Sequence, residues 1–153
     1  MKLFNRFRRK ITGHKTSLDI TGWEIIDCDP INSTDNKKVD RLVQDILKNG
    51  WNGPPILVEG TNLVTGSHRR AALQKLFNMR DDAFSDGDYV TSDRIDMILS
   101  DDNIGEDVSD LMDSWRDRMR GEYGSEIETP YDNLEQIFTG TWVEDYKKEI
   151  AEW

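Results

Sequence analysis

The segment from Leu63 to Phe77 constrains the fold most, because a single glycine joins an apolar run to a helical pattern. The apolar run Leu63-Val64-Thr65 is typical of a short strand, and it ends at Gly66-Ser67. Beyond this turn the apolar residues follow helical spacing, at Ala71, Ala72, Leu73, Leu76 and Phe77. The segment therefore predicts a strand that turns sharply into a helix.

A helix that begins at this turn is suited to bind an anion. Its first N–H groups have no partner within the helix and lie at the positive end of the helix dipole. Gly66 permits a close approach of the ligand, and Ser67 can cap the helix or donate its hydroxyl. Further donors follow at His68, Arg69 and Arg70. The pattern predicts a phosphate site, although a capped helix with solvated arginines explains the spacing equally well.

Upstream of this unit the sequence predicts another helix. Thr34 or Asp35 can cap its N-terminus, and Gly50 is a natural stop signal. Between them the apolar residues share one helix face: Val39, Leu42, Val43, Ile46 and Leu47. Residues 23–27 precede this helix and are typical of a short strand, which Pro30 ends.

A β-hairpin is predicted between the two helices. Ile56-Leu57-Val58 forms its first strand, and Gly60-Thr61-Asn62 turns the chain into Leu63-Val64-Thr65. From these short strands and helices we expect an α+β fold.

We expect three parts: a basic arm over 1–20, a core over 21–103 and an acidic helical extension over 104–153. The extension carries helical apolar stripes that include Val108 to Met119 and Trp142 to Ile150. The Asp-rich stretch 80–103 is expected to be mainly a solvated loop, with a strand or helix near 94–99. The arm has apolar residues on one side, which we expect to dock on the core rather than on a membrane.

The charge is unevenly distributed. The net charge is −10, yet residues 1–15 carry six bases and no acid, while residues 81–153 carry 22 acids and six bases. Such a surface repels nucleic acid as a whole, so a nucleic-acid contact would have to use the basic arm or a positive cleft. The acidic half could instead bind a basic protein partner or imitate nucleic acid.

Composition favours a cytoplasmic protein. No apolar run approaches the ~20 residues that span a bilayer. The basic N-terminus lacks the apolar stretch of a secretory signal. Cys28, the single cysteine, cannot form an internal disulfide.

The order of these motifs over residues 23–80 resembles the ParB/sulfiredoxin superfamily. The resemblance rests on Pro55-Ile56-Leu57-Val58 followed by Gly66-Ser67-His68-Arg69-Arg70-Ala71-Ala72. It implies a fold in which helices pack on a small mixed sheet. It also implies a nucleotide phosphate site at this turn, for ATP as in sulfiredoxins or CTP as in ParB proteins. The residues it implies for binding are Thr65, Gly66, Ser67, His68, Arg69, Arg70 and, at the start of the preceding helix, Lys38, with Lys37 as its neighbouring alternative.

Two departures from the family pattern limit the function. Ser67 stands where sulfiredoxins carry the catalytic cysteine, and a serine cannot perform thiol redox chemistry. The Glu-Asn-X-Gln-Arg segment of ParB proteins is absent, as is a recognisable helix-turn-helix motif. The sequence therefore predicts neither sulfinic-acid reduction nor a chromosome-segregation clamp.

Three carboxylates are candidates for catalysis. Asp27 and Asp29 flank the end of the predicted first strand, where either could hold Mg²⁺ or act as a base. Glu24 is a further candidate, because the resemblance implies an early glutamate in the serine-kinase relatives. Turn formation or a solvated strand face is the preferred interpretation of all three.

Three functions stay open. The first is a nucleotide- or phosphate-binding domain, either without catalysis or acting as a phosphohydrolase or phosphotransferase with Mg²⁺. The second is a non-enzymatic protein that binds a basic partner through its acidic surface. The third is a ParB-like nuclease or DNA-binding protein. A small core with a divergent tail is typical of a phage or plasmid protein.

Overall fold

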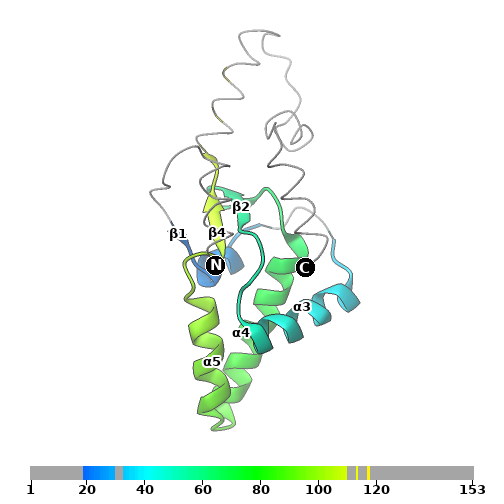
Figure 1. Cartoon of the computed structure of the whole chain (residues 1–153), viewed down its shortest axis with the longest axis vertical. Helices are drawn as coiled ribbons and strands as arrows, with labels where there is room; N and C mark the ends of the chain where they lie inside the picture. The colour runs from blue at the N-terminus through cyan, green and yellow to red at the C-terminus, as the bar shows by residue number, and fades with distance from the viewer. Residues whose placement is uncertain (1–18, 30–32, 110–112, 114–116, 118–153) are drawn as a thin grey trace.

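The computed structural model describes residues 19–29 and 33–109, together with 113 and 117 (Figure 1). In this part of the chain a four-stranded mixed sheet packs with helices, so the predicted α+β class is confirmed. The elements in chain order are β1 (Asp19–Ile20), α2 (Gly22–Ile26), α3 (Asn36–Asn49), β2 (Ile56–Glu59), β3 (Asn62–Leu63), α4 (Ser67–Ser85), α5 (Tyr89–Leu99) and β4 (Gly105–Asp107).

The sheet has the strand order β1-β4-β2-β3. The antiparallel pairing of the predicted hairpin is confirmed, with Val58 opposite Leu63. Its second strand is Asn62–Leu63 and not the predicted 63–65, because Asn62 pairs with Glu59 instead of lying in the turn. On its other side β2 pairs parallel with β4, and Ile56 lies opposite Gly105. Strand β4 in turn pairs antiparallel with β1, with Gly105 opposite Ile20. Neither pairing of β4 was expected from the sequence, because β1 and β4 are only two and three residues long.

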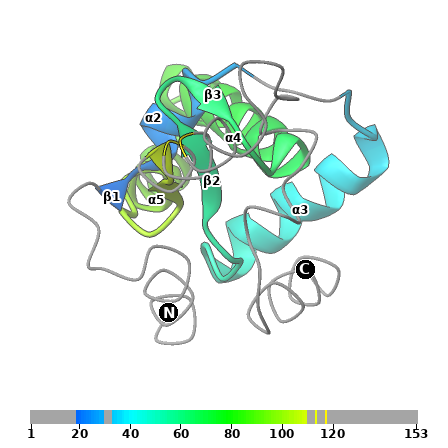
Figure 2. The same cartoon turned by 90° about the horizontal axis from the view of Figure 1, so that it is seen from above.

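Helix α4 is the centre of the helical layer and contacts α2, α3 and α5 (Figure 2). The predicted stripe of α3 is confirmed, with Val39, Leu42, Val43 and Ile46 buried. Asp35 is its N-cap, accepting from the Lys37 N–H at 2.9 Å, and Gly50 ends it at φ +77°. These side chains share one core with Ile56 and Val58 of β2.

Residues 23–26 belong to helix α2 and Asp27 is its C-cap, so the strand predicted over 23–27 is wrong. The Ile25 N–H donates to the Thr21 carbonyl at 3.1 Å, which closes a helical turn. Ile25 and Cys28 are buried, whereas Glu24 and Asp27 are exposed. A five-residue apolar run fits strand and helix equally well, and here helical spacing buries the apolar side chains.

The acidic stretch after residue 80 is also mainly helical, so the predicted loop is wrong there. Helix α4 continues to Ser85 and carries Asp81 and Asp82 on an exposed surface. Asp88 caps α5 by accepting from the Thr91 N–H at 3.1 Å. The helical alternative for residues 94–99 is confirmed, since Ile95, Ile98 and Leu99 are buried.

The basic arm up to residue 18 lies outside the described residues. The predicted apolar stripes beyond residue 109 also lie outside them, since only Asp113 and Asp117 are described there. Within the part of the chain that the structure describes, no helix has both the length and the apolar character to cross a membrane.

Gly105 is predicted to be essential for packing β4 against β1 and α2. A Cβ atom at this position would lie 2.8 Å from Ile20 Cγ2, 2.9 Å from Ile20 Cβ and 2.9 Å from Ile25 Cδ1. Such overpacking costs about 1–3 kcal/mol, so urea unfolding of Gly105→Ala should show a loss at the upper end of this range. Gly60→Ala is the control, because its Cβ would meet nothing within 4 Å and only the φ of +61° opposes it. Equal stability of Gly105→Ala and the wild type would contradict this packing.

Candidate functional site

The turn between the hairpin and α4 is tightly built around Gly66. Its φ is +92°, a left-handed conformation that side chains with a Cβ rarely adopt. A Cβ would also lie 3.0 Å from Arg69 Nη2 and 3.0 Å from Ile56 Cγ1. Both the backbone conformation and the available space therefore require glycine, and the predicted sharp turn is confirmed.

Arg69 lies buried behind this turn. Its side chain is 5% exposed, and Nη1 donates to the Pro54 carbonyl at 2.6 Å. Nη2 is buried and has no hydrogen-bond partner among the described residues. No carboxylate there forms an ion pair with this guanidinium. A buried charge is costly without a counter-charge, so the turn carries a fixed positive charge that an anion would stabilise.

His68 joins the N-termini of α3 and α4. Its Nε2 accepts the backbone N–H of Asp35 at 3.0 Å, and Asp35 is the N-cap of α3. Burial, followed by the charge of Lys38, lowers the pKa of His68, while Asp35 opposes the shift. The imidazole is therefore neutral at pH 7, which agrees with its role as an acceptor. The N-terminus of α3, which the Asp35 carboxylate caps, and the N-terminus of α4 thus meet beside Lys38.

The remaining residues predicted at the turn hold the fold together. Thr65 Oγ1 accepts from the Leu57 N–H at 3.2 Å, which fixes the end of the hairpin. Arg70 donates from Nε to the Cys28 carbonyl and from Nη2 to the Ile26 carbonyl, both at 2.6 Å. These bonds satisfy carbonyls at the C-terminal end of α2. Ser67 is 6% exposed at the first position of α4.

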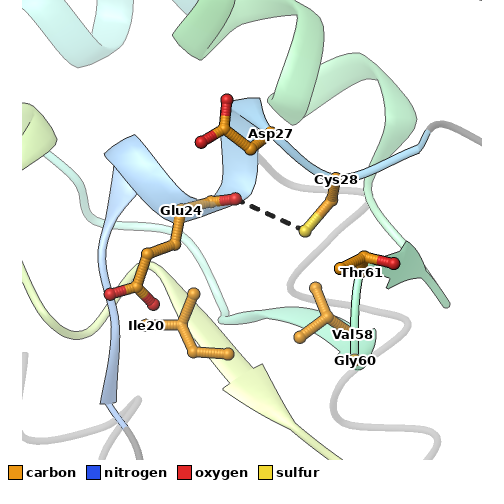
Figure 3. Close-up of a pocket in the computed structure, with 7 residues that line it drawn as sticks. All are labelled: Ile20, Glu24, Asp27, Cys28, Val58, Gly60 and Thr61. Carbon is orange, nitrogen blue, oxygen red and sulfur yellow. Dashed lines mark hydrogen bonds between the residues drawn. The ribbon is translucent and has the colours of Figure 1, made fainter.

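A pocket of about 240 Å³ lies between α2 and the hairpin (Figure 3). Two of the three catalytic candidates, Glu24 and Asp27, line it, but their carboxylates point in different directions. Asp29 instead pairs through its backbone with the hairpin, where its N–H donates to the Thr61 carbonyl at 2.9 Å. The geometry brings Glu24 and Asp27 to one pocket without aiming both carboxylates at one point.

Cys28 also lines this pocket, and sequence reasoning missed that position. Its thiol donates to the Glu24 carbonyl at 3.4 Å. Burial raises the pKa of the Cys28 thiol, against the opposing charge of Arg70, so the neutral form prevails at pH 7. The four-residue spacing of Glu24 and Cys28 would have placed them on one face, had residues 23–27 been assigned as a helix.

Comparison with protein-family models, curated protein sequences and solved structures gives no match for this chain. The resemblance to the ParB/sulfiredoxin superfamily therefore remains a prediction from the motif residues. Among the described residues, no group of three or more His, Cys, Asp or Glu side chains gathers as a metal site.

Cys28 is predicted to react slowly in the native protein. Burial and the raised pKa leave little thiolate at pH 7.5, and thiolate is the reactive form. Iodoacetamide labelling followed by mass spectrometry should be at least tenfold slower than for the same chain in urea. A native rate equal to the rate in urea would show that the thiol is neither buried nor suppressed.

His68 is predicted to make stability depend on pH. Because its folded pKa is lowered, the unfolded chain binds the proton more readily as the pH falls below about 6.5. The neutral imidazole therefore contributes to the free energy of unfolding at pH 7, and this contribution is lost as the pH falls toward 5. Urea titrations should show a steeper loss over this interval for the wild type than for His68→Gln. Parallel curves for the two proteins would contradict the assignment.

Proposed function

We propose that this protein binds the phosphates of a nucleotide, ATP or CTP, at the turn formed by Gly66, Ser67 and His68. The observation that carries the proposal is the buried Arg69 guanidinium, which has an unpaired Nη2 and no carboxylate partner among the described residues. An anion bound at the glycine turn in front of this buried positive charge would stabilise it.

Three further features support an anion at this position. The N-termini of α3 and α4 meet through the bond between the Asp35 N–H and His68 Nε2. Each helix end contributes a partial positive charge. Lys38 lies near enough to His68 for its charge to lower the imidazole pKa. One phosphate group of a nucleotide bound here would neutralise this accumulated positive charge. The second and third phosphate groups of the nucleotide could extend toward Lys38.

Arg69 acts in this proposal through its charge, because its guanidinium is buried, while Lys38 and the N–H groups of the first helical turn make the direct contacts. Mg²⁺ would arrive with the nucleotide, held mainly by its phosphates. Hydrolysis or phosphate transfer would need a base near the ligand. Glu24 and Asp27 remain the candidates, although their carboxylates diverge at the pocket.

Nucleotide binding should raise the melting temperature of the full chain. A ligand at one hundred times its dissociation constant adds about 2.7 kcal/mol of stability. We expect this gain from ATP or CTP, with and without Mg²⁺, in calorimetric titration and thermal melting. If neither nucleotide nor pyrophosphate shifts the melting temperature, the proposal fails.

Lys38→Gln and Lys37→Gln form a matched pair that locates the site. Both remove one positive charge from the first turn of α3, where Lys37 is exposed and Lys38 is half-buried. Loss of one charge-assisted hydrogen bond, about 1.5 kcal/mol, should weaken binding roughly tenfold in Lys38→Gln. Lys37→Gln should stay within about threefold of the wild type, as screened surface charges contribute little. If Lys37→Gln weakened binding more than Lys38→Gln, Lys37 and not Lys38 would be the residue that contacts the phosphate.

A further inference from the structure

The hairpin of α4 and α5 exposes apolar side chains to solvent. Among the described residues, the large apolar side chains that stay exposed are Phe84 at 56%, Tyr89 at 57%, Val90 at 83% and Met97 at 72%. All four belong to this hairpin, which projects from the end of the molecule opposite the sheet (Figure 1). Exposed apolar side chains that gather in one place are typical of interaction surfaces.

Three of these side chains form what we call the tip patch: Phe84, Tyr89 and Val90. The rings of Phe84 and Tyr89 pack edge to face, with centroids 5.4 Å apart. Val90 follows Tyr89 in the first turn of α5. Met97 lies seven residues further, on the same helix face and roughly 10 Å along the axis. Met97 is thus an apolar side chain on the same side of α5 as Val90, separated from the tip patch by Asp93 and Arg94.

The turn that carries the tip patch is well defined. The Gly87 N–H donates to the Phe84 carbonyl at 3.2 Å, and the Asp88 N–H donates to the Ala83 carbonyl at 2.8 Å. Gly87 takes a left-handed conformation with φ +80°. Asp88 then accepts from Thr91 Oγ1 at 2.6 Å and caps α5. A surface held in this way loses little conformational entropy on binding.

Acidic side chains surround the tip patch. Between residues 81 and 97 the chain has six aspartates and one arginine. That arginine, Arg94, reaches away toward α3, where its Nε donates to the Leu47 carbonyl at 3.4 Å. Among the described residues, no cation pairs with the exposed carboxylates of Asp82, Asp86 and Asp93. The apolar surface therefore carries an unneutralised negative rim.

We infer that the tip patch is a docking surface for a basic, amphipathic helical segment of another protein. Apolar side chains of that segment would cover Phe84, Tyr89 and Val90, while flanking lysines or arginines would meet the aspartate rim. Charge complementarity of this kind speeds association and excludes partners of like charge. A second copy of the chain would bring two aspartate rims together, and anionic lipid would meet the same repulsion.

A synthetic 14-residue helical peptide, with leucine on one face and lysine on the other, is the direct probe. Fluorescence anisotropy should show saturable binding to the full chain, and the affinity should fall as salt rises. Two control peptides separate the contributions: one carries glutamate in place of lysine, and the other carries serine in place of leucine. Both should bind at least tenfold more weakly. Equal binding of either control would overturn the proposed chemistry.

Variants of the protein test whether the peptide binds to the α4–α5 hairpin. Phe84→Ser combined with Val90→Ser should weaken binding at least tenfold, and Val90→Ser alone, at a position 83% exposed, gives a fold-safe second test. Asp86→Lys should weaken binding several-fold, whereas Asp40→Lys, the same charge change on α3, should leave it within twofold. Unchanged binding in Val90→Ser and Asp86→Lys would refute the site.

Sedimentation of the chain alone tests the alternative that a second copy of the chain covers the tip patch. A dimer that Val90→Ser converts to monomer would show that the tip patch joins two copies, which contradicts the proposal. Lys38→Gln should bind the peptide as the wild type does. The docking surface and the phosphate site therefore succeed or fail independently.

Discussion

The left-handed turn at Gly66 is the constraint on which the described fold depends. Because this residue has no Cβ, Ile56 of β2 and the Arg69 guanidinium can both pack against it, at distances a side chain would not permit. Arg69 then bonds to Pro54 at the entry to β2, and Arg70 bonds to the end of α2. The first turn of α4 thereby fixes the positions of the hairpin and of α2.

The same arrangement concentrates positive charge. Arginines that hold carbonyl groups in place bring their charge into the protein, and Arg69 is left without a carboxylate partner in the described part of the chain. The bond from Asp35 to His68 adds the N-terminus of α3 to that of α4. Much of the remaining surface is acidic, most clearly on the α4–α5 hairpin. The described surface is therefore divided into one region suited to an anion and another suited to a cationic partner.

How far the sequence predicts this structure depends on the strength of each local pattern. The α3 stripe and the Gly66 turn have long periodicity or specific turn residues, and both were predicted correctly. The hairpin pairing was also predicted, but its second strand begins one residue earlier and ends two residues earlier than predicted. Residues 23–27 are too few for periodicity to separate helix from strand, and β4 gains its place through pairing with β1 and β2. At the site, the turn was predictable from its glycine and helix start. The reach of Arg70 to α2, and the pocket beside Cys28, depend on tertiary contacts that no local pattern contains.

We propose that an anion binds where the N-termini of α3 and α4 converge. Backbone amide chemical shifts measured by NMR, as pyrophosphate is added to the ¹⁵N-labelled full chain, test this claim most directly. The account predicts saturable shifts concentrated at Ser67, His68 and Arg69 in α4 and at Lys37 and Lys38 in α3, with the tip of the α4–α5 hairpin unchanged. Shifts that are absent, or that occur mainly outside these two helix starts, would contradict it.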